Sequence, residues 1–213
     1  MLFRSNLGLS PERVGACVRE VGIGFLFAPM MHGAMKYAIG PRREIGIRTL
    51  FNILGPMTNP AGANVQLTGV FAPELTTVLA EVLVRLGMRR AIIVWGEGNL
   101  DEMTVTGATH IADGHDGQVT TSIITPEQVG LKTAPFATIR GGRTAAAAAE
   151  QVRAVLGGEP GPKLDMVLLN AGTTLMAAGL VPDIRAGIDR ARETVRSGAA
   201  LAKLDQLIAF CRG

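Results

Sequence analysis

The sequence has few aromatic residues, few cysteines and no block of like charge. Phe, Trp and Tyr make up 4% of the 213 residues, which argues against the aromatic platforms on which single-stranded nucleic acids stack. The net charge is only +3, and no run of Lys and Arg alternates with aromatic residues, so no nucleic acid partner is expected. Cys17 and Cys211 lie far apart and outside any CxxC motif, so they give no signal for a disulfide or a metal site.

Long apolar runs are also missing. No stretch approaches the length of a membrane-spanning helix, and the first residues contain no extended apolar segment of the kind found in signal peptides. Together with the isolated cysteines, these features favour a cytoplasmic protein without membrane contact. The hydrophobic content of 47% is enough for a sizeable core.

Apolar periodicity and helix-capping residues divide the chain into alternating helices and strands. The fully apolar run at 91–95 predicts a strand buried on both faces, and a helical pattern separates it from a strand at 65–70. This order implies parallel pairing, so we predict an α/β fold with a mostly parallel central sheet flanked by helices and a β-hairpin insertion. The other expected strands are 25–28, 103–112 and 118–124, and the expected helices are 11–21, 73–86, a short helix from 126, 145–156, 163–180, 183–196 and 199–211.

Polar side chains that could bind a ligand or take part in catalysis are concentrated between residues 25 and 60. His32 follows the predicted strand 25–28, and open α/β sheets bind ligands beyond the carboxyl ends of their strands. Arg42 lies in the first turn of a predicted helix that ends at Gly55-Pro56, and its planar guanidinium suits a carboxylate or a phosphate. The alternative is an ordinary surface arginine, or a partner for Glu44.

A second candidate site follows the strand at 91–95. There a Gly-rich loop presents Asp101 and Glu102, and adjacent carboxylates on such a loop suit Mg²⁺. An ordinary acidic surface loop is the alternative. His110 and His115 lack a third partner at ligand spacing, so we expect them to be exposed turn residues rather than metal ligands.

Asn170 lies inside the strongly apolar segment 163–180. An Asn in an apolar helix is usually a structural group whose amide is satisfied by hydrogen bonds, and we interpret Asn170 in that way.

The stretch from Phe27 to Ala61 resembles the anthranilate phosphoribosyltransferase family. A second matching segment is the acidic loop, where the family pattern DExSxxGxT has Thr104 in place of Ser and so keeps the hydroxyl. The chain departs from the family at Gly33, Pro41 and Met57, and none of these changes removes a polar group. The residues that carry the first match are Phe27-Ala28-Pro29, His32, Ala34-Met35-Lys36, Arg42, Glu44-Ile45-Gly46, Arg48-Thr49, Phe51-Asn52, Leu54-Gly55-Pro56 and Asn59-Pro60-Ala61.

This resemblance implies the α/β domain of the nucleoside phosphorylase and phosphoribosyltransferase type, and a glycosyltransferase of tryptophan biosynthesis. The implied reaction transfers phosphoribose from phosphoribosyl diphosphate to anthranilate, with Mg²⁺ and without a catalytic base. The alternatives are a related enzyme acting on another aromatic acceptor, or an inactive fragment that needs a partner. The implied anthranilate-binding residues are Ala28, His32, Arg42 and Gly55, and the implied Mg²⁺ ligands are Asp101 and Glu102.

The family's N-terminal helical subdomain and Gly-rich phosphate loop have no counterpart in the sequence. We therefore expect residues 1–213 to be a single α/β domain that is truncated at its N-terminus. Full-length members are expected to be homodimers, but this chain on its own is expected to self-associate irregularly and to have negligible transferase activity.

Overall fold

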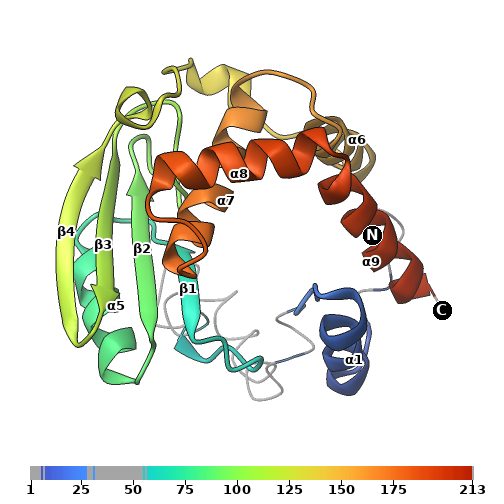
Figure 1. Cartoon of the computed structure of the whole chain (residues 1–213), viewed down its shortest axis with the longest axis horizontal. Helices are drawn as coiled ribbons and strands as arrows, with labels where there is room; N and C mark the ends of the chain where they lie inside the picture. Colours follow the sequence, from blue (N-terminus) through green and yellow to red (C-terminus); the bar gives the residue numbers. More distant parts are fainter. Residues whose placement is uncertain (1–5, 7, 28–30, 32–54, 56, 213) are drawn as a thin grey trace, which may run out of the picture.

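The computed structural model describes residues 6, 8–27, 31, 55 and 57–212. Its elements are labelled in Figure 1. They are α1 (Pro11–Val21), β1 (Val65–Gly69), α5 (Leu75–Arg85), β2 (Arg90–Gly96), β3 (Thr109–His115), β4 (Gln118–Ile124), the short 3₁₀ helices η3 (Pro126–Val129) and η4 (Phe136–Ile139), α6 (Ala145–Leu156), α7 (Pro162–Ala177), α8 (Ile184–Arg196) and α9 (Ala199–Arg212).

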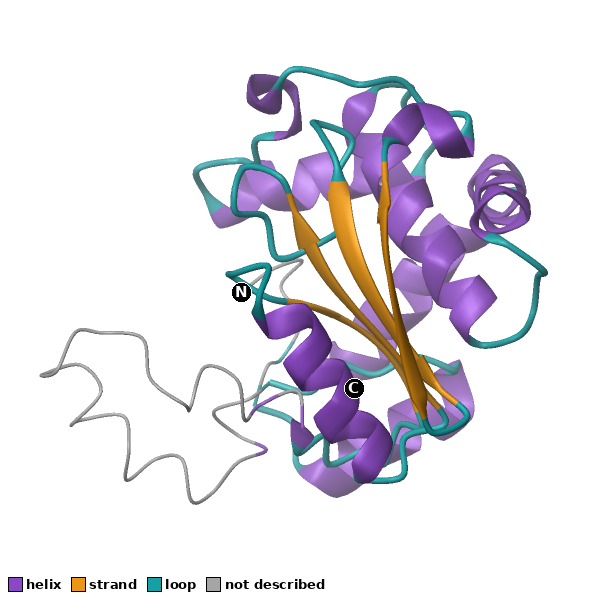
Figure 2. Ribbon diagram, turned by 90° about the vertical axis from the view of Figure 1, so that its left-hand side faces the viewer, coloured by secondary structure: helices purple, strands orange, loops and turns teal. Residues whose placement is uncertain are grey.

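The four strands form one twisted sheet in the order β1-β2-β3-β4, with helices on either side of it (Figure 2). β1 and β2 pair in parallel and are joined through α5, which confirms the predicted strand–helix–strand unit and the α/β class. β3 pairs antiparallel with β2, and β4 pairs antiparallel with β3. The predicted hairpin therefore extends the same sheet beyond its parallel pair. Among the described strands only β1 and β2 pair in parallel, so the expectation of a mostly parallel sheet holds for that pair alone.

β2 lies at the centre of the core, because residues 91–94 have no exposed surface. Ile92 and Val94 belong to a cluster that includes Leu168 and Leu169 of α7, whereas Ile93 faces a second cluster formed with α5. The sheet is thus covered by α7 on one face and by α5 on the other (Figure 1). The C-terminal helices do not all lie on the sheet, because α8 packs mainly on α7, and α9 packs on α1 and α8.

The α7–α8 contact depends on two glycines. A Cβ atom added to Gly172 would lie 2.6 Å from the Ile188 nitrogen, and one added to Gly187 would overlap the Gly172 backbone. The two helices therefore meet backbone to backbone, and a side chain at either glycine would push α8 away from α7.

Helix starts agree with the capping signals of the sequence. The Ser10 hydroxyl accepts from the Arg13 N–H (3.3 Å), the Thr144 hydroxyl from the Ala147 N–H (3.2 Å), and the Asp183 carboxylate from the Ala186 N–H (2.8 Å). At the other end of α1, Gly22 has φ 83°, a left-handed conformation that glycine adopts readily.

Three sequence-based boundaries need correction or lie outside the structure. Residues 25–27 form no strand, because a short apolar run becomes a strand only where a neighbouring strand pairs with it. Phe25 is instead 57% exposed, and the centre of its ring lies 6.5 Å from that of Phe27. β3 begins at Thr109 rather than at residue 103, and the hairpin turn is only Asp116-Gly117. The helix predicted to end at Gly55 lies outside the described residues.

Both cysteines are buried, Cys17 in α1 and Cys211 in α9, and neither forms a disulfide. Over residues 6, 8–27, 31, 55 and 57–212, no helix combines the length and the apolar character needed to cross a bilayer.

A partly buried ion pair joins the amino end of β2 to β3 and α7. Arg90 donates from Nε to Asp113 Oδ1 (3.0 Å) and from Nη2 to Asp113 Oδ2 (2.6 Å), and its Nη1 donates to the Met176 carbonyl (3.3 Å). The two side chains are 23% and 18% exposed, so water screens them only in part. This bidentate pair ties three elements together at one point.

Arg90→Met should therefore lower the free energy of unfolding by about 1.5–3 kcal/mol, because it leaves the Asp113 carboxylate partly buried without its charged partner. The matched control is Arg192→Met, which removes a 2.7 Å pair with Asp189 on the surface of α8, where the side chains are 37% and 68% exposed. That change should cost about 0.5 kcal/mol or less. Equal losses for the two variants in urea titrations would contradict the structural role of Arg90.

Candidate functional site

The acidic pair lies on the loop that connects β2 to β3, beyond the carboxyl ends of the parallel strands. Two strand-terminal glycines let this loop fold back over the sheet. A Cβ atom at Gly69, the last residue of β1, would overlap the Asp101 carbonyl, and one at Gly96, the last residue of β2, would lie 2.6 Å from the Glu102 carbonyl oxygen. Asp101 and Glu102 therefore lie at the edge where α/β folds bind ligands.

Backbone hydrogen bonds fix the part of the loop that precedes the acidic pair in the chain. The Gly96 N–H donates to the Leu100 carbonyl (2.8 Å), and the Leu100 N–H donates back to the Gly96 carbonyl (3.0 Å). Glu97 closes the base of the loop, because its N–H donates to the Ala108 carbonyl (2.8 Å) and its carboxylate accepts from the Ala108 N–H (3.0 Å). Gly96, Leu100 and Glu97 thus anchor the residues that lead to Asp101.

Threonine hydroxyls order the part of the loop that follows. The Thr109 hydroxyl accepts from the Thr104 N–H (3.1 Å), and the Thr104 hydroxyl accepts from the Thr106 N–H (3.0 Å). The hydroxyls of Thr104 and Thr106 are 2.8 Å apart. Thr104 is 1% exposed, so the hydroxyl at this position satisfies a backbone donor inside the protein.

Asn170 of α7 contacts the loop directly. Its Oδ1 accepts from the Met103 N–H (3.0 Å), and its Nδ2 donates to the carbonyls of Met103 (2.9 Å) and Met166 (2.9 Å). This confirms that Asn170 is a hydrogen-bonded structural residue. The sequence alone did not indicate that its partner would be the residue next to Glu102.

Among the residues that the structure describes, the two carboxylates have no cationic partner. In the described part of the chain, neither Asp101 nor Glu102 has a salt bridge to a basic side chain, and both residues are exposed. Packing around the Glu102 carboxyl raises its pKa above the ordinary value, and the neighbouring Asp101 charge raises it further. A bound cation would oppose both effects, because a nearby positive charge favours the ionised form of a carboxyl group.

Histidine and cysteine do not extend this site. Among the residues that the structure describes, no three His, Cys, Asp or Glu side chains are grouped closely enough to hold a metal ion together. The loop offers the carboxylate oxygens of Asp101 and Glu102, and Mg²⁺ suits such a site because it binds one or two carboxylates and completes its shell with water and phosphate oxygens.

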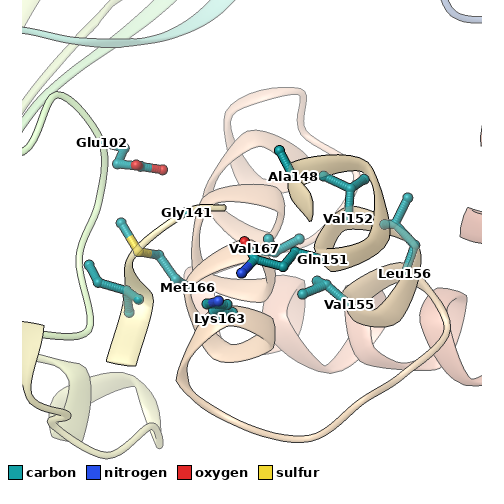
Figure 3. A pocket seen from close by; sticks show the side chains of 11 residues that line it. Glu102, Gly141, Ala148, Gln151, Val152, Val155, Leu156, Lys163, Met166 and Val167 are labelled. Carbon is teal, nitrogen blue, oxygen red and sulfur yellow. The ribbon is translucent and has the colours of Figure 1, made fainter. Parts of the chain in front are cut away.

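A cavity of about 290 Å³ opens beside Glu102. Figure 3 shows the Glu102 side chain facing this cavity from its loop, opposite residues of α6 and α7. The lining is mostly apolar, with Gln151 and Lys163 as its other polar side chains. Sequence reasoning missed this cavity, because the apolar side chains of α6 and the α7 start become a wall only when the two helices meet.

Most of the predicted anthranilate-binding residues lie outside the residues that the structure describes. Ala28, His32 and Arg42 lie outside the described residues. Gly55 is described and is exposed to solvent. The grouping of these four residues around one ligand therefore stays a prediction.

The two remaining histidines differ from expectation in their location. Both belong to β3, and both are partly buried rather than exposed in a turn. His110 packs edge-on against Trp95 with 5.2 Å between ring centroids, and His115 Nδ1 lies 3.3 Å from an Asp113 oxygen. The turn that the sequence indicated is shorter than predicted, so its flanking residues extend the strand.

Proteins of known activity resemble this chain closely over part of their length. The anthranilate phosphoribosyltransferase of Desulfotalea psychrophila is 65% identical over 96% of this chain and 59% of that protein. The enzyme of the same name from Thioalkalivibrio sulfidiphilus is 51% identical over 96% of this chain and 60% of its own length. The chain thus spans about three fifths of the curated relatives it matches.

Solved structures show the same likeness. Anthranilate phosphoribosyltransferase from Thermus thermophilus superimposes with a TM-score of 0.92 and 42% identity, over 100% of this chain and 64% of that one. The Saccharomyces cerevisiae enzyme in complex with PRPP and Mg superimposes with a TM-score of 0.89 and 25% identity, over 99% of this chain and 61% of that one. The model for the glycosyl transferase family, a/b domain, matches residues 2–201, and this chain belongs to that family.

Proposed function

We propose that this chain is the α/β portion of an anthranilate phosphoribosyltransferase, which transfers phosphoribose from phosphoribosyl diphosphate to the amine of anthranilate. The observation that carries the proposal is the acidic loop of a family member, folded over the carboxyl ends of β1 and β2 with two carboxylates that have no cationic partner among the described residues. The high identity to enzymes of this activity supports the choice of substrates.

In this proposal Asp101 and Glu102 hold Mg²⁺ together with the diphosphate group. The lack of a cationic partner among the described residues and the raised pKa of Glu102 fit a cation site, and the structure of the yeast relative is a complex with PRPP and Mg. The ion would neutralise the charge that develops on the departing diphosphate. The carboxylates would position the ion, and the glycines at the strand ends let their loop fold over the ends of β1 and β2.

The acceptor half of the proposal rests on the resemblance. Arg42 pairs with the carboxylate of anthranilate, His32 and Ala28 line the ring pocket, and Gly55 lets the backbone approach the ligand. The arylamine is neutral and already nucleophilic, so the protein needs to align it rather than to deprotonate it. The unpaired, buried thiols of Cys17 and Cys211 support a reducing, cytoplasmic setting as part of the same proposal.

The combined variant Asp101→Asn/Glu102→Gln keeps side-chain size and removes the charge that Mg²⁺ requires. We expect binding of Mn²⁺, used as a substitute for Mg²⁺, to fall at least tenfold. In the catalytically active form of the protein, the Mg²⁺ dependence of diphosphate release should be lost. The free energy of unfolding should stay the same or rise slightly, because the variant removes repulsion between two like charges and the partial desolvation of the Glu102 carboxylate.

Isothermal titration calorimetry and a diphosphate-release assay measure these two effects. The matched control is Asp116→Asn in the β3–β4 turn. It removes one carboxylate at the opposite end of β3 from the acidic loop and should leave Mn²⁺ affinity unchanged. A wild-type Mn²⁺ titration in the combined variant would rule out the metal role of Asp101 and Glu102.

Arg42→Ala tests the acceptor half. In the catalytically active form of the protein, the variant should raise the KM for anthranilate and leave that for phosphoribosyl diphosphate nearly unchanged. Loss of a charge-assisted bidentate pair corresponds to about 1.5–3 kcal/mol, or roughly 10- to 150-fold in KM. Equal shifts of the two KM values would show that Arg42 does not bind the anthranilate carboxylate.

A further inference from the structure

Two reciprocal pairs of hydrogen bonds bracket the acidic residues. On one side Leu100 exchanges N–H and C=O bonds with Gly96, and on the other Met103 exchanges N–H and C=O bonds with the side-chain amide of Asn170. Only Asp101 and Glu102 lie between these two anchors. The first anchor belongs to the strand end itself, whereas the second comes from a helix 67 residues further along the chain.

The Asn170 amide acts at this point as a peptide group would in a sheet. It donates and accepts on the same residue, so it sets the position and the orientation of the Met103 peptide. Met103 has no exposed surface, and a buried N–H and C=O need partners inside the protein. The antiparallel ladder between β2 and β3 ends at Gly96 and Thr109, so it offers Met103 none.

Asn170 is itself held rigidly. The second proton of Nδ2 is donated to the Met166 carbonyl one turn earlier in α7, which fixes the rotation of the amide. α7 in turn packs on the sheet through Leu168 and Leu169 and against α8 through the close contact of Gly172 with Gly187. A rigid helix therefore transmits its position to the loop through one side chain.

We infer that Asn170 is a positioning residue for the metal-binding loop: its amide sets the backbone next to Glu102, and so sets the separation and aim of the two carboxylates that hold the cation. This inference rests on the proposed metal site at Asp101 and Glu102. Other side chains of similar size fail for clear reasons. Asp accepts but, when ionised, has no proton to donate, and Leu does neither.

Two variants of the full 213-residue chain test the inference with Mn²⁺ as the probe. Asn170→Leu keeps the volume and removes both bonds to Met103, so it should weaken Mn²⁺ binding at least tenfold. Asn170→Asp keeps the acceptor for the Met103 N–H but adds a negative charge near the cation. Charge alone would tighten Mn²⁺ binding in the Asp variant, whereas loss of the Met103 carbonyl anchor weakens it, so the direction of the change separates the two effects.

A second readout needs no metal. Amide hydrogen exchange at Met103 should accelerate in Asn170→Leu, because the donor loses its acceptor, and should stay slower in Asn170→Asp. The matched control is Thr174→Val, one turn further along α7, which removes a hydroxyl bond to the Asn170 carbonyl and leaves the amide contacts in place. It should match the wild type in both measurements, made at a temperature where circular dichroism shows all variants folded.

The outcomes distinguish the inference from the proposed function. If Mn²⁺ binding is lost in Asp101→Asn/Glu102→Gln but is unchanged in Asn170→Leu, or is tightened in Asn170→Asp, the positioning role is wrong and the metal site stands. If the wild type and the Asp101→Asn/Glu102→Gln variant bind Mn²⁺ equally, the proposed metal site fails and the positioning role fails with it. Weaker binding in both Asn170 variants, with faster exchange at Met103 in the Leu variant, supports the inference.

Discussion

The parallel pairing of β1 with β2 is the constraint on which the rest of the described structure depends. Parallel strands end at the same edge of a sheet, so the loop that follows β2 can fold over the end of β1 as well. It does so only because each strand ends in glycine, at Gly69 and Gly96, where a side chain would occupy the path of the loop. One feature of strand topology therefore brings the acidic pair to the ligand-binding edge of the fold.

α7 has two roles that reinforce each other. Its apolar side covers β1 and β2, and the same helix reaches the acidic loop through Asn170 and the start of β2 through the Met176 carbonyl. α7 thus runs antiparallel to β2 and forms hydrogen bonds near both ends of that strand, through Asn170 beyond its carboxyl end and through Met176 at its amino end. Packing energy that stabilises the core also sets the position of the loop, so the site inherits the rigidity of the core.

The charged side chains at the two ends of β2 differ in whether they are paired. At the amino end of β2, Arg90 and Asp113 neutralise each other, which suits a structural contact. Beyond the carboxyl end, Asp101 and Glu102 remain without compensation from the described residues and the pKa of Glu102 is raised, which suits a group that awaits a cation. The contrast between the ion pair of Arg90 with Asp113 and the two carboxylates without a cationic partner among the described residues favours a functional role for the carboxyl end of β2.

The sequence by itself determined the features that depend on neighbouring residues. Capping by Ser10, Thr144 and Asp183, the burial of 91–94 and the β1–α5–β2 order were all predictable, because capping and periodicity act within a few residues. The acidic pair could also be picked out from its place after a buried strand. Only the tertiary structure decided that 25–27 is not a strand, that Asn170 binds Met103, and that α6 and α7 enclose a cavity beside Glu102. Each of these depends on a partner far away in the chain, and no local pattern records which distant surfaces will meet.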